Sequence, residues 1–334
     1  MKGCMKSVII FAGLALSGLA AGWLGFRYSQ PEPVTRAIPL MSISCKITAP
    51  GTPEAVDKPI EQAFQRMREI ERKFSAFNQS GPVYRFNHEN IPITDPEIIG
   101  LIKIAREVHR ESAGAFDITI KPLVQLWGLY KNTQPGIPDP NAIRTTLDVI
   151  GFQHLIIGND SVTKDRLEVM IDFGGIAKGY AVKECVKVLR NEGVQSALIE
   201  LGGQVYGFGK LNKQPWRVGL RHPRDSGVSD DLFINDTSVS TSGDYERFFM
   251  KDGVRYHHIL NPRTGYPTRG IISMSVIMPD PVLADAWSTA FFVIGPDKAL
   301  DIIRQKPGME IIMVTDEGRV IQTPDIARYI RSEK

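Results

Sequence analysis

The chain has 334 residues, of which 43% are hydrophobic and 23% charged, the balance of a globular protein with room for a sizeable core. Its 40 basic and 37 acidic residues give a formal net charge of +3 without a long run of either sign, so the charge pattern does not suggest a nucleic-acid partner. The three cysteines, Cys4, Cys45 and Cys185, lie far apart, which excludes a CxxC metal or redox motif and allows at most one disulfide.

Residues 1–30 have the pattern of a signal or membrane anchor. Lys2 and Lys6 precede an uncharged apolar stretch at 8–26, close to the roughly 20 residues that a helix needs to cross a bilayer. Basic residues before such a stretch favour a cytoplasmic N-terminus and export of the rest. A cleaved signal peptide is the alternative, because "SGLA" at 17–20 offers small residues for cleavage. We favour an uncleaved anchor, and in either case expect the body to work across the inner membrane, facing the periplasm.

The next elements follow from proline content and apolar spacing. A polar, proline-containing linker is expected at 31–40, followed by a strand within 40–50. Apolar residues recur every three or four positions at 53–74 and at 96–112, which predicts two amphipathic helices. Strands are predicted at 154–157, 167–172, 196–201, 204–208 and 216–220, and helices at 176–191 and 284–305. Bunched strands with helices inserted between them favour an α+β domain over a regular βαβ arrangement.

The segment "IDFGGIAKGYA" at 171–181 suggests a ligand-binding turn. A strand ending at Ile171, two glycines and a helix from about Ile176 would direct backbone N–H groups at a ligand. The Walker A and GxGxxG patterns are absent, however. The alternative is a glycine-rich turn without a ligand. Asp172 and Lys178 in the same turn favour the ligand.

Two further segments carry candidate chemical groups. In "VLADAWSTAFFVIG" at 282–295, Asp285 and Thr289 share one helical face and Ser288 lies beside them, a set of hard oxygen ligands suited to Mg²⁺. Taken alone, a helix-capping Asp285 and a packed Thr289 are the favoured reading. In "RYHHILNPRTGYP" at 255–267, strand alternation would point His257 and His258 to opposite faces, so one of them can face a cleft as a general base. Taken alone, a structural role is favoured for either histidine.

Weaker candidates lie earlier in the chain. Asp117 follows a turn of small residues, and a helix cap is its alternative role. Phe77 lies in an aromatic-containing loop, where it either stacks on a flat ligand or packs. The hydroxyl-rich "VSTSGDYERFF" at 239–249 is read as a turn and nothing more.

Eight segments, in this order and spacing, resemble the ApbE-type FAD:protein FMN transferases. They run from about residue 41 to about residue 295 and read "MSISCKI", "KFSAFNQSGPVYRFN", "GAFDITIKPLVQLWG", "IDFGGIAKGYAV", "ALIELGGQVYGFG", "VSTSGDYERFF", "HHILNPRTGYP" and "ADAWSTAFFVIG". The resemblance implies a single α+β catalytic body with a T-fold-like core at 41–334, behind the N-terminal segment.

The implied activity is transfer of FMN from FAD to a threonine or serine hydroxyl of a partner protein. It would depend on Mg²⁺, cleave the pyrophosphate, release AMP and leave a phosphoester bond. The implied partners are acceptor subunits of membrane electron-transfer complexes of the NADH:quinone reductase or Rnf type, modified on the outer side of the inner membrane. The N-terminal pattern agrees with that location.

The resemblance also assigns residues. FAD contacts fall on Met41, Phe77, Ala115, Phe116, Asp117, Asp172, Lys178 and Ile259. The carbonyl of Gly175 would hold Mg²⁺ together with Asp285, Ser288 and Thr289. The implied catalytic residues are His258, as the base for the attacking hydroxyl, and Asp285, through the metal.

Three departures from the family pattern and two alternative functions accompany this assignment. Glu200 and Gln204 flank "LGG" where an amide and an acid are more usual. Lys121 stands where the family commonly has a small residue before "PL", and Phe77 replaces a hydroxyl-bearing or larger aromatic ring. The alternative functions are an Mg²⁺-dependent FAD pyrophosphatase that yields FMN and AMP, and a non-enzymatic flavin-binding assembly factor. The combined presence of Asp285, Thr289 and His258 favours turnover.

Overall fold

The computed structural model describes residues 32–130, 133–224 and 227–330. The anchor or signal segment predicted at 1–30 lies outside these ranges. Within them, none of the helices combines the length and apolar character that a membrane crossing requires.

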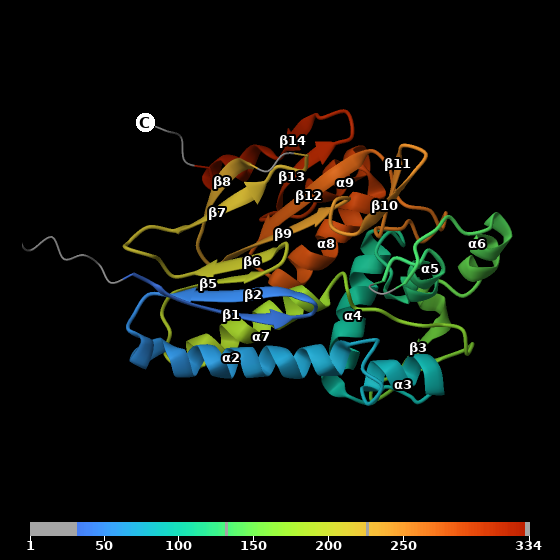
Figure 1. The fold of residues 1–334 in the computed structure, drawn as a ribbon, viewed down its shortest axis with the longest axis horizontal. Helices are drawn as coiled ribbons and strands as arrows, with labels where there is room; N and C mark the ends of the chain where they lie inside the picture. Colours follow the sequence, from blue (N-terminus) through green and yellow to red (C-terminus); the bar gives the residue numbers. More distant parts are fainter. Residues whose placement is uncertain (1–31, 131–132, 225–226, 331–334) are drawn as a thin grey trace, which may run out of the picture.

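The centre of the molecule is one eight-stranded sheet (Figure 1). Each strand pairs antiparallel with its neighbours, in the order β1-β2-β5-β6-β9-β12-β13-β14. The strands are β1 (Val34–Leu40), β2 (Ile43–Ala49), β5 (Ala197–Leu201), β6 (Gln204–Phe208), β9 (Thr237–Gly243), β12 (Ile271–Met278), β13 (Glu310–Thr315) and β14 (Val320–Gln322). The predicted α+β class is confirmed.

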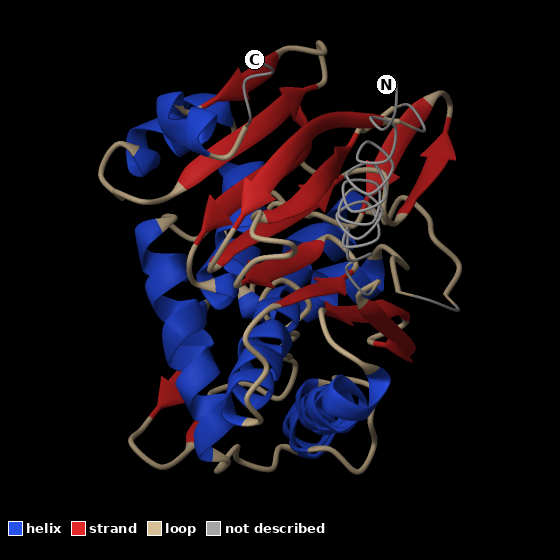
Figure 2. Ribbon diagram, turned by 90° about the vertical axis from the view of Figure 1, so that its left-hand side faces the viewer, coloured by secondary structure: helices blue, strands red, loops and turns tan. Residues whose placement is uncertain are grey.

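Helices cover one face of this sheet, and a hairpin covers part of the other (Figures 1 and 2). The main helices are α2 (Pro53–Phe74), α4 (Pro96–Glu111), α7 (Ala177–Asn191) and α8 (Pro281–Ile294), and the hairpin is β7 (Trp216–Arg221) with β8 (Val228–Ile234). Because side chains alternate along a strand, Val276 joins the core under the helices while Ile277 joins the cluster under β7 and β8. The central strands are therefore buried on both faces.

The remaining elements surround this frame. They are α3 (Pro82–Glu89), η1 (Ile118–Ile120), α5 (Lys121–Leu126), α6 (Pro140–Leu147), η2 (Phe152–His154), β3 (Leu155–Ile157), β4 (Val162–Lys164), β10 (Phe248–Lys251), β11 (Val254–His257), α9 (Pro296–Ile303) and η3 (Pro324–Arg328). The predicted helix at 53–74 is confirmed as α2, and those at 96–112 and 176–191 correspond to α4 and α7.

The linker predicted at 31–40 is wrong from Val34 onward, because this segment is strand β1. Val34 and Leu40 are buried, and the strand turns into β2 through Met41 and Ser42, both with positive φ (49° and 66°). The strand expected within 40–50 is thus the second half of a hairpin. Pro39 is tolerated because β1 is an edge strand, where a missing backbone N–H costs no sheet hydrogen bond.

Two other predicted elements differ from the structure. Residues 167–172 form no strand, because a side chain satisfies their backbone: Asn87 accepts from the N–H of Ile171 (2.8 Å) and donates to its carbonyl (2.9 Å). The helix predicted at 284–305 is two helices, α8 and α9. They are separated by Gly295, whose φ of 88° no regular helix permits.

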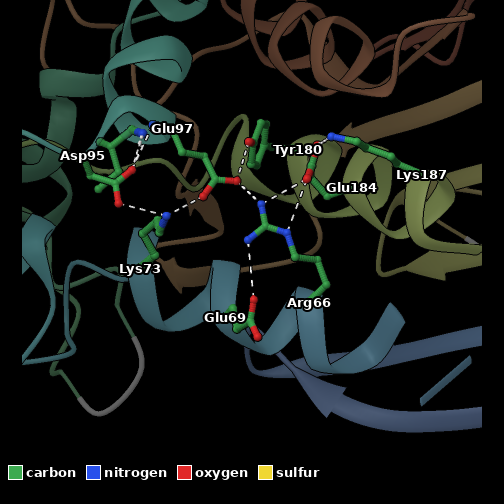
Figure 3. Close-up of polar contacts among 9 residues, drawn as sticks. Arg66, Glu69, Lys73, Asp95, Glu97, Tyr180, Glu184 and Lys187 are labelled. Atoms are coloured by element: carbon green, nitrogen blue, oxygen red, sulfur yellow. Dashed lines mark hydrogen bonds and ion pairs between the residues drawn. The ribbon is translucent and has the colours of Figure 1, made fainter. Parts of the chain in front are cut away.

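A charged cluster joins three of the helices (Figure 3). Glu97, at the start of α4, accepts hydrogen bonds from Lys73 of α2 (2.5 Å), from the Tyr180 hydroxyl of α7 (2.6 Å) and from Arg66. Arg66 also donates to Glu184 of α7 (3.0 Å). Burial alone would raise the pKa of Glu97, but the hydrogen bonds from Lys73, Tyr180 and Arg66 lower it below the ordinary value. This cluster fixes α7 against α2 and α4.

Replacing Glu97 by glutamine should therefore destabilise the fold by about 2–3 kcal/mol, because Arg66 and Lys73 lose a shared, largely buried counter-charge. Since the folded-state pKa of Glu97 is lowered, its stabilisation is complete above the unfolded value of ~4.3 and is lost as the pH falls through the folded value. Urea unfolding at pH 7 and at pH 3 tests this, with a smaller difference expected at pH 3. Glu61→Gln, at an exposed pair with Arg68, is the control and should cost under ~1 kcal/mol. Equal loss in both variants at pH 7 would contradict the role of the cluster.

Candidate active site

The glycine turn before α7 is closed by Asp172. One carboxylate oxygen accepts from the N–H of Gly174 (2.6 Å), and the other accepts from the Tyr130 hydroxyl (2.9 Å). The backbone N–H of Asp172 donates to Ile118 O (2.8 Å), which ties this turn to the segment after Asp117. Helix α7 then begins at Ala177, and Ile176 at its N-cap gives no side-chain cap. The turn is as predicted, but an Asx turn rather than a strand leads into it.

Asp285 of α8 supplies the missing cap from another helix. One of its carboxylate oxygens accepts from the backbone N–H of Gly179 (2.9 Å), and the other accepts from Lys178 Nζ (2.9 Å). Only 2% of Asp285 is exposed. The alternative that Asp285 caps its own helix is wrong, because Asp280 caps α8 through Val282 and Leu283. Asp285 instead joins α8 to the N-terminus of α7.

Gly179 is required at this junction. A Cβ there would lie 2.1 Å from Pro281 O and 2.9 Å from the Cβ of Asp285. No other residue type lets α7 and α8 approach so closely, and only this approach brings Asp285 to the helix terminus.

Hydroxyl groups surround the carboxylate. Ser242 of β9 lies 2.9 Å from Ser288 and 3.4 Å from Thr289, measured between side-chain oxygens. Ser288 donates to the carbonyl of Asp285 (2.8 Å) and lies 3.3 Å from Ser240. The two β9 serines were missed in the sequence, where "VSTSGDYERFF" was read as a turn. The signal lay in the spacing of two between Ser240 and Ser242, which places both on one face of a strand.

The oxygen-rich site fits a divalent cation by the chemistry of its donors. Gly175 lies against Thr289 and Phe116, since a Cβ on it would be 3.3 Å from Thr289 Oγ1 and 3.0 Å from the Phe116 ring. The ammonium of Lys178 donates to one oxygen of Asp285 and to Gly174 O, with Nζ 3.1 Å from the latter. These oxygens therefore already interact with one positive charge. Among the described residues, no group of three or more His, Cys, Asp or Glu is suited to a metal. A cation here would therefore depend on hydroxyl and carbonyl oxygens beside one carboxylate, as Mg²⁺ permits.

Phe77, Tyr130 and Lys121 form an aromatic corner next to Asp172. Phe77 meets Tyr130 edge to face, with ring centroids 4.9 Å apart, and 59% of Phe77 is exposed. Lys121 Nζ lies 4.4 Å from the centroid of Phe77 and 4.7 Å from that of Tyr130. Burial lowers the pKa of Lys121, and the charge of Asp172 acts in the opposite direction. Hydrogen bonding through Tyr130 connects the corner to the glycine turn.

The segment around Asp117 is bonded to the glycine turn, because the N–H of Asp172 donates to Ile118 O. Asp117 is buried and accepts from the N–H (2.8 Å) and the hydroxyl (2.7 Å) of Thr119, so the helix-cap role considered for it is confirmed. His109 Nδ1 lies 3.3 Å from its second oxygen. Burial alone would lower the pKa of His109, but Asp117 raises it. The half-buried Ala115 and the buried Phe116 precede Asp117 in the same turn.

The two histidines have different surroundings, but not by strand alternation, because β11 ends at His257 and His258 lies in the bend that follows it. His257 is buried, with Nε2 2.9 Å from Thr268 O, and packs edge to face on Phe292. His258 is half-buried, with Nδ1 3.3 Å from Arg247 O. Burial, followed by the charges of Arg247 and His257, holds the pKa of His258 well below its usual range. A lowered pKa favours the neutral form of the His258 imidazole.

Two predicted ligand residues lie at the edges of this arrangement. Ile259 is buried directly after His258. Met41 lies in the β1–β2 turn, where its N–H donates to Glu71 near the end of α2 (2.5 Å). Phe74, which ends α2, packs edge to face on Phe173 of the glycine turn. Met41 is therefore linked to the turn through α2.

A sequence model of the ApbE family matches residues 41–313. The chain belongs to the ApbE family. It is a transferase enzyme of that family, and the resemblance seen in its eight segments is confirmed.

Relatives and solved structures agree over most of the chain. A FAD:protein FMN transferase of Klebsiella pneumoniae (strain 342) is 30% identical over 306 residues, covering 86% of this chain and 87% of the relative. That of Treponema pallidum (strain Nichols) is 31% identical, covering 83% of this chain and 82% of the relative. The crystal structure of the ApbE protein of Thermotoga maritima superposes with a TM-score of 0.83 at 32% identity, covering 90% of this chain and 100% of that one.

The contact between α7 and α8 in this ApbE chain gives a direct test. Gly179→Ala should cost about 1–3 kcal/mol through overpacking against Pro281 O and should abolish activity by displacing Asp285. Gly100→Ala is the matched control, because Gly100 also lies in a helix but a Cβ there meets nothing within 4 Å. It should stabilise the protein by about 0.5–1 kcal/mol. Thermal unfolding of both variants measures the difference, and a Gly179→Ala protein as stable as the control would refute the packing argument.

Proposed function

We propose that the enzyme transfers FMN from FAD to a threonine or serine hydroxyl of a partner protein, with Mg²⁺, through a phosphoester bond and with release of AMP. The observation that carries the proposal is the junction of α7 and α8. There, buried Asp285, Lys178 and a group of hydroxyls meet at a helix terminus suited to phosphates. The relatives named FAD:protein FMN transferase support the choice of substrate.

The proposed reaction needs a base, and His258 is suited to that role. The acceptor oxygen attacks the phosphorus of the FMN phosphate, the bond from that phosphorus to the oxygen bridging it to AMP breaks, and the hydroxyl proton passes to His258. A hydroxyl has a pKa far above 7, so a neutral base within reach accelerates this step. The low pKa of His258 keeps it neutral, and therefore able to accept the proton, at physiological pH.

The remaining residues bind and orient the substrate. Gly175 O, Asp285, Ser288 and Thr289 would hold Mg²⁺, which when bound neutralises charge on the phosphates. FAD would be held by Met41, Phe77, Ala115, Phe116, Asp117, Asp172, Lys178 and Ile259. The oxygens of Asp117 and Asp172 already accept hydrogen bonds from the protein, so we expect them to fix the shape of the turn as much as to contact the ligand.

The location and the partners are part of the same proposal. An N-terminal anchor would hold the enzyme at the inner membrane with its body in the periplasm. The acceptors would be subunits of electron-transfer complexes of the NADH:quinone reductase or Rnf type. The support is the pattern of basic and apolar residues at 1–30 together with the exported acceptors that the family resemblance implies.

The decisive experiment mixes the purified protein, FAD, Mg²⁺ and a candidate acceptor domain. Flavin fluorescence that stays on the acceptor band after denaturing electrophoresis is the expected result. Free FMN and AMP without a labelled acceptor would replace transfer by FAD hydrolysis. FAD that remains intact would leave only a binding role.

Asp285→Asn should reduce transfer at least about a hundredfold, because the amide retains an oxygen for the Gly179 N–H but lacks the charge for a cation. Mg²⁺ titration of the residual rate should show weakened metal dependence. Asp280→Asn, five residues earlier in the chain, should behave as wild type, because asparagine caps a helix equally well. Undiminished transfer by Asp285→Asn would remove this residue from the mechanism.

The low pKa of His258 predicts a particular pH profile. The transfer rate at saturating FAD should stay level as the pH falls from 8 to 6, through the ordinary histidine pKa of ~6.5, and should fall only below that range. His258→Ala should lower the rate by about 10²- to 10⁴-fold at all these pH values while FAD binding persists. A wild-type profile that is half-maximal near pH 6.5 would argue against an environment-lowered pKa.

A further inference from the structure

Two buried lysines of this protein differ in the contacts that their ammonium groups make. Lys164 donates hydrogen bonds to three backbone carbonyls, those of Asn87 (3.1 Å), Leu167 (2.9 Å) and Val169 (2.9 Å). Lys121 is only 3% exposed, yet among the residues that the structure describes its ammonium meets two aromatic faces and no hydrogen-bond acceptor. Desolvation of a charge costs stability, and titratable groups with a perturbed pKa are enriched at functional sites.

Phe77, whose ring lies over the ammonium of Lys121, is largely exposed. Phe77 lies in the loop between α2 and α3 and has 59% of its surface exposed. Its recorded ring contacts are the edge-to-face contact with Tyr130 and the ammonium of Lys121. One face of Phe77 therefore rests on a cation, and much of the rest of the ring is open. A flat aromatic ligand would stack on that open side.

The aromatic corner is connected to the glycine turn. Tyr130, whose ring also faces Lys121, donates its hydroxyl to Asp172 (2.9 Å). Asp172 accepts from Gly174 N–H, and Gly174 O accepts from Lys178, the partner of Asp285. A ring stacked on Phe77 would thus be placed relative to the group that handles the phosphates.

We propose that Lys121 is a positioning residue for the nucleotide substrate: its ammonium holds the inner face of Phe77, so that the outer face is fixed as a platform for a flat ring of that substrate. This inference rests on the proposed function for the identity of the nucleotide, FAD. It also gives a role to a lysine that stands where the family commonly has a small residue.

The test compares Lys121→Met, Lys121→Arg and Lys164→Met in the full-length protein. Loss of a cation–π contact should raise the KM for FAD and the Kd from flavin fluorescence quenching by about 2- to 30-fold in Lys121→Met, with kcat retained. Arginine also binds aromatic faces and should restore most of the affinity. Lys121→Met should leave the Tm close to that of wild type, because removing the ammonium ends both its desolvation and its attraction to Asp172. Lys164→Met should lower the Tm, because three backbone carbonyls lose their donor.

A second set of variants separates Lys121 from Phe77. Phe77→Ala should weaken FAD binding by a similar factor, and the double variant should be no weaker than Phe77→Ala, because Lys121 acts through that ring. Phe77 lies in an exposed loop, so its variants test the platform even if Lys121→Met does not fold. Fully additive losses in the double variant, or an unchanged KM and Kd in Lys121→Met, would overturn the inference.

Failure of the proposed function would look different. A wild-type protein that quenches flavin fluorescence but transfers nothing would refute transfer while still allowing the Kd comparison. A wild-type protein that binds no FAD would refute both proposals.

Discussion

The site depends on one carboxylate that joins two helices. Helix α7 has no side-chain cap of its own at Ile176, and Asp285 supplies one by accepting from Gly179 N–H at 2.9 Å. The same carboxylate holds Lys178, which in turn holds Gly174 O. This bridge links the glycine turn and the terminus of α7 to the hydroxyls of α8. The cap and the proposed metal ligand are thus one group.

The central sheet forms the other wall of the site, where serines of β9 replace apolar side chains on one face. Strand β9 carries Ser238, Ser240 and Ser242 at a spacing of two, while Val239 belongs to the core on the opposite face. Ser240 and Ser242 meet Ser288 of α8. Small hydroxyls on a strand let the helix lie close and satisfy its polar side, which apolar side chains of the usual size would not. The polar site is therefore built into the core rather than placed on a loop.

Much of the helical frame could be predicted from the sequence, and much of the sheet could not. Helices α2, α4 and α7 have one buried face each, so their apolar spacing is visible in the chain. Strands β12 and β13 are buried on both faces, so the alternation that identifies a strand is absent. Strand β1 was hidden by Pro39, by the prolines that precede it and by its polar residues. Distance along the chain was the main obstacle at the site, because Gly179 and Asp285 are 106 residues apart.

The local roles of site residues were also ambiguous in the sequence. Asp117 is a helix cap as well as a candidate ligand, and both readings came from the same position after a turn. Taken alone, Asp285 was favoured as a cap of its own helix, because a carboxylate near a helix start has that role by default, and only the family resemblance assigned it to the metal. Only the packing of α7 on α8 shows that it caps a different helix. Lys121 was recognised as a departure from the family pattern, but its aromatic partner Tyr130 follows nine residues later, and its burial is a property of the fold.

Contacts further along α7 stabilise the helix whose N-terminus forms part of the site. Desolvation of Lys121 opposes folding, and Lys121 lies next to the glycine turn through Tyr130 and Asp172. Tyr180, the residue after Gly179, donates to Glu97 in the cluster that joins α7 to α2 and α4. The contacts that join α7 to α2 and α4 therefore begin one residue beyond Gly179. A helix anchored there can keep its N-terminus in a geometry that serves chemistry rather than stability, because the loss at the turn is offset by contacts the turn does not share.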